Sequence, residues 1–306
     1  MIVKNKTFTS KQSFTSKSDI TFENCTFSGI RDVSLTFNKC SKIVIRSCTF
    51  SECGGVYAVH SSDVIVEYCS ADNIHSPEPR GQFFQSNDCQ GPIWIHHNYV
   101  KCDPTKTYAG KVRVIEDIIN LYKTYCSEKN RAIIEYNNID HGGVSPSGGG
   151  LLVGDNGGSW QIIRYNKLHT PGQYGIACAG GENIELVGNE IYSPKTSVSN
   201  VGLYVWPAKA STPDIRNVVV KNNKSNWVSK KTGNSNGFWK GSRVHSMTIS
   251  NNNWNWDGVP DLTTFLDGTK VGSSIPIPTS PVIPKVEGFY YVNIRTGQKK
   301  SSNTTF

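Results

Sequence analysis

The chain has 306 residues, of which 37% are hydrophobic and 18% are charged, and it carries 28 glycines among many Asn, Ser and Thr residues. This composition is poor for α-helices and suits short β-strands joined by polar turns. No segment reaches the roughly 20 consecutive apolar residues of a membrane-spanning helix, so we expect no membrane span. The net charge of +8 favours an acidic polymer as partner. The lysines and arginines are scattered, however, which argues against nucleic acid.

A short pattern recurs along the chain: an apolar residue, any residue, an apolar residue, a polar residue, any residue and a small residue. The first copies read ITFENC, IVIRSC and VIVEYC, and later copies such as AIIEYN and QIIRYN end in Asn instead of Cys. The residues that end the nine copies are Cys25, Cys48, Cys69, Asn98, Asn137, Asn166, Asn189, Asn223 and Asn252. Their spacing of 21 to 39 residues fits one coil of a β-helix plus loops of variable length. Stacked coils would place these side chains above one another, about 4.8 Å apart, as an inward ladder that hydrogen-bonds the turns.

A second set of strands is predicted one short turn before the ladder strands. These strands cover residues 33–37, 82–85, 118–123, 151–155, 174–178, 201–206 and 237–240. The segments after the ladder residues are rich in Gly, Pro and Ser, and we expect them to form exposed loops. The sequence therefore predicts an all-β fold, a right-handed parallel β-helix solenoid of about nine coils over residues 19–256. Residues 1–18 are predicted to cap its open end, and residues 257–306 to form a Pro-rich tail that packs on the solenoid.

The Asn ladder, the short turn before each ladder strand and the variable loops after it resemble those of the pectate-lyase-like superfamily over roughly residues 15–256. That superfamily includes polysaccharide lyases, glycoside hydrolases, esterases, epimerases and non-catalytic phage or surface adhesins. The resemblance implies a binding groove on the outward face of the second strand set. It assigns no catalytic residue, because no catalytic motif of the superfamily is matched.

Alternation along the second strand set predicts which side chains line this groove. The predicted outward residues are Asn120, Tyr122, Gly154, Ala177, Tyr204, Trp206 and Trp239. Small residues flanked by aromatic rings would form a trough on which sugar rings stack. The alternative is an exposed sheet face whose small residues only permit close stacking of the coils.

Basic residues near this column are candidates for catalysis. Lys123 ends one groove strand and Arg80 lies just before the preceding one. Such a pair could neutralise a uronate carboxylate and remove the C5 proton in a β-elimination. The resemblance points the same way, since lyases of the superfamily use Arg or Lys as the base, often with Ca²⁺ bound by acidic groups. His141 and His169, each at the entrance of a loop, are alternative bases, and the alternative for Lys123 is a solvated lysine at a strand end.

The acidic residues leave several interpretations open. Glu116 and Asp117 open a groove strand and suggest an acid pair or a Ca²⁺ site, but adjacent residues of a strand face opposite sides, which weakens both ideas. Asp155 and Lys240 are counted among the substrate-binding residues. The alternative for Asp155 is structural: its alignment with Cys178 predicts that it faces inward and holds the following glycine turn. No CxxC motif or His/Cys cluster predicts zinc. We therefore assign no metal ligand, and Ca²⁺ stays open as a cofactor.

The nine cysteines are not spaced as a disulfide framework. Cys25, Cys48 and Cys69 belong to the ladder and are predicted to be buried free thiols. One or two bridges stay open among the cysteines at turns, which are Cys40, Cys53, Cys89, Cys102 and Cys126.

The favoured function is a polysaccharide lyase that cleaves an acidic, uronate-containing polysaccharide by β-elimination. Two other classes stay open: a non-catalytic glycan-binding or adhesin-type β-helix, and a glycoside hydrolase or epimerase on the same fold. We expect an extracellular, surface or virion-associated protein. The first residues, MIVKNKTFTSKQ, lack the apolar region of a signal peptide, so a removed signal, another export route and an intracellular location stay open. The sequence does not distinguish a monomer from a trimer.

Overall fold

The structure is a computed structural model that describes residues 1–75, 81–105, 107–108, 111–112, 115–142, 145, 147–207, 209–272, 290–292 and 299–301. The chain divides into two units, residues 1–273 and 274–306. The second unit contains an antiparallel pair of strands, β30 (Tyr290–Val292) and β31 (Lys299–Ser301). All other strands belong to the first unit, and the described residues contain no α-helix. No helix in this part of the chain is therefore long and apolar enough to cross a membrane.

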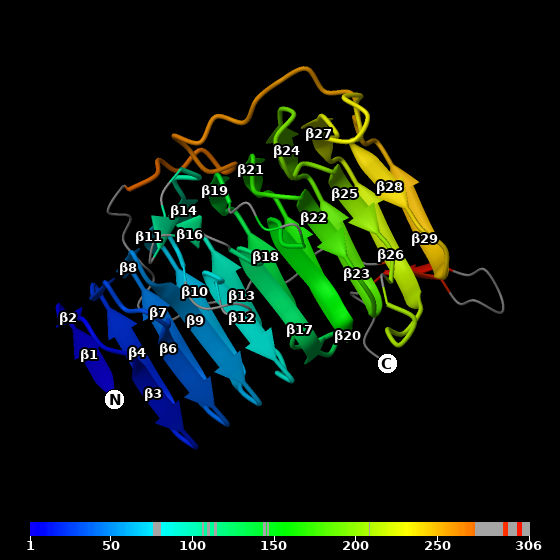
Figure 1. Cartoon of the computed structure of the whole chain (residues 1–306). Helices are drawn as coiled ribbons and strands as arrows, with labels where there is room; N and C mark the ends of the chain where they lie inside the picture. The colour runs from blue at the N-terminus through cyan, green and yellow to red at the C-terminus, as the bar shows by residue number, and fades with distance from the viewer. Residues whose placement is uncertain are drawn as a thin grey trace. The chain divides into compact units, whose positions relative to one another are not determined.

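Most coils of the first unit contribute three strands, and strands of successive coils pair in parallel (Figure 1). The groove sheet contains β3 (Gln12–Thr15), β6 (Val33–Asn38), β9 (Gly54–Val59), β12 (Phe84–Asn87), β17 (Ile119–Tyr125), the first half of β20 (Leu151–Arg164), β22 (Tyr174–Cys178), β25 (Val201–Val205) and β28 (Phe238–Lys240). The ladder sheet contains β1 (Ile2–Lys4), β4 (Ser18–Glu23), β7 (Ser41–Arg46), β10 (Ser62–Glu67), β13 (Ile93–His96), β18 (Ala132–Glu135), the second half of β20, β23 (Glu182–Val187), β26 (Ile215–Lys221) and β29 (Val244–Ser250). The groove sheet is the predicted second strand set, and the solenoid prediction is confirmed.

The third sheet is formed by short strands that follow the ladder residues. The short sheet has nine strands: β2 (Thr7–Phe8), β5 (Thr26–Ser28), β8 (Thr49–Ser51), β11 (Ser70–Asp72), β14 (Tyr99–Lys101), β19 (Asn138–Asp140), β21 (Lys167–His169), β24 (Glu190–Ser193) and β27 (Lys224–Trp227). A separate antiparallel pair, β15 (Thr107–Tyr108) and β16 (Lys111–Val112), lies within one of the long insertions. Like side chains stack inside the solenoid, as in Phe8, Phe27 and Phe50, whose successive rings lie 5.1 and 5.0 Å apart. One continuous core therefore runs through the coils.

The asparagine ladder has the predicted geometry. From Asn98 to Asn223, each Nδ2 donates to Oδ1 of the Asn on the next coil at 2.9 to 3.0 Å. The backbone N–H of each ladder residue donates to the same oxygen, at 3.0 Å for Asn166. These side chains are fully buried from Asn98 to Asn223. The ladder thus satisfies backbone groups at the turns that water cannot reach.

All nine cysteines are free and buried. Cys25, Cys48 and Cys69 occupy the ladder as predicted, and the backbone N–H of Cys69 donates to Oδ1 of Asn98 at 2.9 Å. The disulfides kept open among the other five cysteines are absent, because these residues also point into the stacked core as small apolar side chains.

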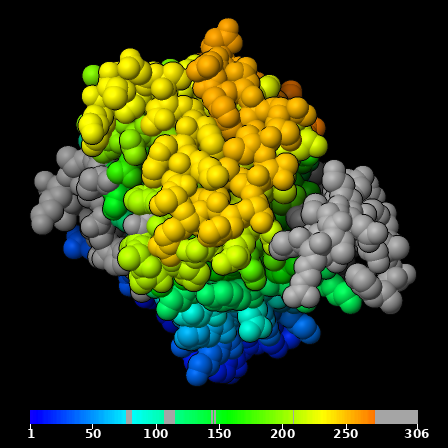
Figure 2. All heavy atoms as spheres, turned by 90° about the vertical axis from the view of Figure 1, so that its right-hand side faces the viewer, coloured from blue at the N-terminus to red at the C-terminus, as the bar shows by residue number. Residues whose placement is uncertain are grey.

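The segment predicted as an N-terminal cap, residues 1–18, is part of the solenoid itself. Its strands β1, β2 and β3 pair in parallel with β4, β5 and β6. The repeat therefore begins here without a recognisable ladder copy, and the role of these residues as a cap of the open end stays a prediction. At the other end, where the last coils are yellow and orange in Figure 2, Phe238 and Trp254 stack with ring centres 4.8 Å apart.

Residues 257–272, the first part of the predicted tail, return along the side of the solenoid. Nζ of Lys167 donates to the carbonyl oxygens of Asp261 and Thr264 at 2.7 and 2.8 Å. The amide of Asn138 donates to the same Thr264 oxygen at 2.9 Å, and Phe265 is buried. The Pro-rich stretch after residue 272 lies outside the described residues.

Candidate active site

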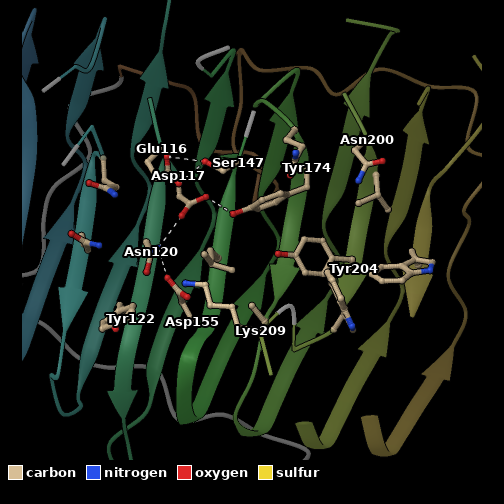
Figure 3. A pocket seen from close by; sticks show the side chains of 18 of the residues that line it. Glu116, Asp117, Asn120, Tyr122, Ser147, Asp155, Tyr174, Asn200, Tyr204 and Lys209 are labelled. Atoms are coloured by element: carbon tan, nitrogen blue, oxygen red, sulfur yellow. Dashed lines mark hydrogen bonds between the residues drawn. The ribbon is translucent and has the colours of Figure 1, made fainter. Parts of the chain in front are cut away.

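A groove of about 680 Å³ lies on the outward face of the groove sheet (Figure 3). Its lining comes from β12, β17, β20, β22, β25 and β28 and from the segments that adjoin these strands. Acidic side chains line the coils of β17 and β20, whereas aromatic rings line the coils of β25 and β28. The groove therefore combines a polar centre with an apolar platform, on the face that the sequence indicated.

The column of outward residues differs from the predicted one. The observed column follows the register partners on successive coils. It runs through Asn120 of β17, Leu152 of β20, Ala177 of β22, Tyr204 of β25 and Trp239 of β28. Leu152, and not Gly154, continues the column that starts at Asn120. Tyr122 pairs with Asp155 instead, because the register between β17 and β20 shifts on both sides of Tyr122.

Gly154 is part of this irregularity and does not form the groove floor. Its φ is +64°, and a Cβ at this position would lie 1.9 Å from the carbonyl oxygen of Gly180. Its N–H donates to Oε1 of Gln161 at 2.8 Å. The shift turns Asp155 into the groove, so its predicted inward orientation was wrong, whereas its place among the groove residues holds.

Asp117 is the most deeply buried acid of the groove. Its side chain accepts hydrogen bonds from the Tyr174 hydroxyl, from the backbone N–H of Gly149 at 3.1 Å and from Nδ2 of Asn120 at 2.8 Å. Burial raises the pKa of Asp117 to about 7, although the hydrogen bonds from Tyr174 and Asn120 oppose the shift. Asp117 can therefore hold a proton near neutral pH and give it up in a reaction.

Asn120 links Asp117 to a second carboxylate. Its Nδ2 also donates to Oδ2 of Asp155 at 3.0 Å, so one amide group lies between the two acids (Figure 3). Asp155 is less buried than Asp117, and burial raises its pKa while nearby Lys209 lowers it. The two acids thus lie close together in different environments, which is the arrangement that separates the roles of a catalytic acid and its partner.

Glu116 completes the acidic part of the groove. Its carboxylate accepts from the Ser147 hydroxyl at 2.9 Å, and both residues line the groove. The prediction that Glu116 and Asp117 face opposite sides was wrong, since β17 begins only at Ile119 and strand alternation does not apply before it.

Aromatic rings form the platform beside the acids. The rings of Tyr174 and Tyr204 meet edge to face with centres 5.2 Å apart, and those of Trp206 and Trp239 do so at 5.0 Å. Trp239 is 42% exposed although it is a large apolar side chain. The half-exposed ring of Trp239 offers a face on which the apolar side of a sugar can stack.

A sequence model of the right-handed β-helix region matches residues 10–224. The chain belongs to this family. No protein with a curated description matches the sequence.

Three solved structures illustrate what this β-helix resembles. The catalytic domain of a GH87 α-1,3-glucanase in complex with tetrasaccharides has a TM-score of 0.50 and 14% identity, over 83% of this chain and 49% of that one. Pectate lyase C from Erwinia chrysanthemi has a TM-score of 0.44 and 13% identity, over 87% and 78% of the two chains. The Streptococcus pneumoniae surface protein and adhesin PfbA has a TM-score of 0.35 and 8% identity, over 76% of each. The chain spans about half the length of the glucanase domain, and likeness at these identities describes the fold alone.

The predicted substrate-binding residues mostly gather in the groove of this β-helix. Those that line it are Asn120, Tyr122, Asp155, Tyr204, Trp206 and Trp239. Lys240, the last residue of β28, is exposed and outside the lining. Sequence reasoning missed Tyr174 and Lys209, because nothing local marks either residue as a neighbour of Asp117 or Asp155.

Two of the predicted catalytic residues, Lys123 and His141, lie outside the groove lining. Nζ of Lys123 lies 5.5 Å from the centre of the Tyr122 ring. His141 follows a strand of the short sheet and contacts Asp140, with Nδ1 and Oδ1 2.7 Å apart. Arg80 lies outside the described residues.

The groove acids do not fit the Ca²⁺ site that the superfamily resemblance suggests. The position between Asp117 and Asp155 is taken by the Asn120 amide, a hydrogen-bond donor where a cation would need to lie. Among the described residues of the groove, no three His, Cys, Asp or Glu side chains have ligand atoms within 4.8 Å of one another. The arrangement fits carboxylates that exchange protons better than carboxylates that bind a cation.

Proposed function

We propose that this protein is a glycoside hydrolase in which Asp117 is the general acid and Asp155 is its partner carboxylate. The observation that carries the proposal is the pKa of about 7 that burial gives Asp117, one amide group away from a less buried acid. Two carboxyl groups in different environments are the usual equipment for cleaving a glycosidic bond.

In this reaction the proton of Asp117 passes to the glycosidic oxygen as the bond from that oxygen to the anomeric carbon breaks. Asp155 faces the positive charge that develops at the anomeric carbon, and it either attacks this carbon itself or removes a proton from the attacking water. Burial and the neighbouring Asp117 raise the pKa of Tyr174 well above its usual range. The Tyr174 hydroxyl therefore keeps its own proton and orients Asp117 by donating to it.

The charges of the lining support a neutral sugar as substrate. Glu116 and Asp155 face the groove beside the protonated Asp117, and Lys209 is the cation of the described lining. A uronate in the same place would bring another negative charge to these acids, at a cost in binding free energy. The alternative is the function predicted from the sequence, β-elimination on an acidic polysaccharide. Its positively charged groups would have to be Lys209 or residues outside the described part. A polysaccharide substrate also agrees with the predicted extracellular, surface or virion location, which we propose with it.

The test is a panel of neutral and acidic polysaccharides, monitored for new reducing ends and for the ultraviolet absorbance of unsaturated uronates. We expect reducing ends without absorbance. Asp117→Asn should lower turnover by about 100- to 10,000-fold, the usual contribution of a general acid, and Asp155→Asn should do the same. Asp214→Asn is the matched control, because Asp214 pairs with Arg243 and His245 outside the groove.

Three outcomes contradict the proposal. Unsaturated products would identify a lyase, and binding of a glycan without any product would identify a non-catalytic protein. An Asp117→Asn variant that keeps full turnover, with unchanged circular dichroism, would remove Asp117 from the reaction. Proton NMR of the first products then distinguishes the two roles of Asp155, since direct attack retains the anomeric configuration and attack by water inverts it.

A further inference from the structure

We propose that Asp140, His141 and His169 form a binding site for a divalent transition-metal ion, with Zn²⁺ as the expected occupant. Among the described residues, this is the one group of three ligating side chains whose donor atoms all lie within 4.8 Å of one another. The group is separate from the groove acids, and the proposal does not depend on the hydrolase function.

The fold brings the three residues together from two consecutive coils. Asp140 ends β19, His169 ends β21, and the two residues are register partners across the short sheet. His141 follows Asp140 with a φ of +62°, a left-handed conformation that recurs at the corresponding turn of other coils, as at Asn73 and Thr170. This backbone geometry accompanies the close approach of the His141 ring to Asp140.

The distances fit a tetrahedral site. Oδ1 of Asp140 lies 2.7 Å from Nδ1 of His141 and 3.5 Å from Nδ1 of His169. A metal ion bound at 2.0 to 2.2 Å requires ligand atoms about 3.3 Å apart, so only small side-chain movements are needed. Two imidazole nitrogens and one carboxylate oxygen suit Zn²⁺ and leave one coordination position for water.

A second observation points to a missing ligand. Nδ1 of His169 is buried from solvent and lies 3.5 Å from Oδ1 of Asp140, but it forms no hydrogen bond of normal geometry with any residue that the structure describes. The other side of the ring is fixed by stacking on Tyr192, with centres 5.0 Å apart. A buried polar atom without a well-formed hydrogen bond costs free energy, and a metal ion between His169 and Asp140 would bind this nitrogen directly.

The position of the site indicates what the ion would do. His141 and His169 begin the two chain segments that lead to the groove, and the N–H of His141 donates to the carbonyl oxygen of His169 at 2.8 Å. Farther along these segments, Gly149 and Tyr174 donate to Asp117. An ion that links the starts of both segments would hold these two donors in place.

The test uses the untagged full-length chain, stripped with chelator and titrated with Co²⁺, whose visible absorption reports tetrahedral coordination. We expect one Co²⁺ per chain, displacement of Co²⁺ by Zn²⁺ and a higher melting temperature with either ion. His141→Ala and His169→Ala should each weaken binding at least tenfold, in line with the loss of one ligand. His245→Ala is the matched control, because His245 also pairs with an aspartate, Asp214 at 3.0 Å.

Three results overturn the proposal. The first is wild-type protein that binds Co²⁺ no better than the His141→Ala/His169→Ala double variant. The second is the appearance of near-ultraviolet bands of a cobalt–thiolate bond, which would place the ion at a cysteine, and the third is binding at millimolar Co²⁺ only. Circular dichroism of each stripped variant separates loss of the ligand from loss of the fold.

Discussion

The burial of Asp117 predicts how the stability of the protein depends on pH. The pKa of this carboxyl rises from 3.8 to about 7 on folding. Between these two values the folded protein keeps a proton on Asp117 that the unfolded chain has released. The folded state therefore loses stability as the pH rises through this window, and the contribution is fully present only below the unfolded pKa.

The size of the effect follows from the shift. A shift of about three pH units corresponds to a change on the order of 4 kcal/mol in the free energy of unfolding. Asp117→Asn removes the titration and preserves the shape of the side chain. The stability of the wild type relative to this variant should therefore fall by that order of magnitude between about pH 4 and about pH 7.

The assay is urea unfolding of both proteins at several pH values across the window, and the quantity of interest is the difference between them. Groups that titrate in this range without interacting with Asp117 cancel in the difference. Glu185 is one of them, since burial raises its pKa to about 7 in both proteins. For Asp214→Asn the difference should stay nearly flat, because His245 and Arg243 lower the pKa of Asp214 and move its titration below the window. A flat difference for Asp117→Asn would refute the reasoning and, with it, the role of Asp117 as a general acid.

Three further predictions concern the ladder, the platform and the thiols. Asn166→Ala leaves the buried N–H of Asn137 without its acceptor and should lower the free energy of unfolding by about 2–4 kcal/mol in urea, whereas exposed Asn130→Ala should change it by less than about 0.5 kcal/mol. Trp239→Ala should weaken glycan binding about tenfold, measured by calorimetry, with little change in melting temperature, and Ile249→Ala, equally exposed at 44%, should leave binding unchanged. The buried cysteines should react with a thiol reagent only as fast as the protein unfolds. Burial keeps them from solvent and, for example, raises the pKa of Cys53 to about 11. Labelling of the folded protein within seconds, detected by mass spectrometry, would contradict this prediction.

The architecture could be predicted from the sequence because it depends on repetition. Each coil places a small residue at the same turn, and Asn98, Asn137 and Asn166 can satisfy one another only if the coils stack in register. That requirement is visible in the sequence as the recurring pattern before each ladder residue. The N-terminal strands escaped prediction because their copy of the pattern lacks a ladder residue.

The floor of the groove could be predicted only in part. Alternation placed Tyr204 and Trp239 correctly, since β25 and β28 pair without irregularity. It failed at Gly154 because the register between β17 and β20 shifts. A bulge arises from the pairing of two strands that are distant in sequence, and a glycine in either strand is compatible with a bulge or with a flat stretch.

The sequence by itself determined the solenoid, the ladder and the face that carries the groove, because each of these repeats from coil to coil and so leaves a periodic trace. Only the tertiary structure decided the chemistry. Asp117 acquires its pKa from burial, and it is bound by Gly149 and Tyr174, 32 and 57 residues away in the chain. His141 and His169 likewise meet because β19 and β21 are neighbours across the short sheet. Desolvation and contacts between coils depend on where loops of unequal length place single side chains, and a periodic pattern carries no information about that.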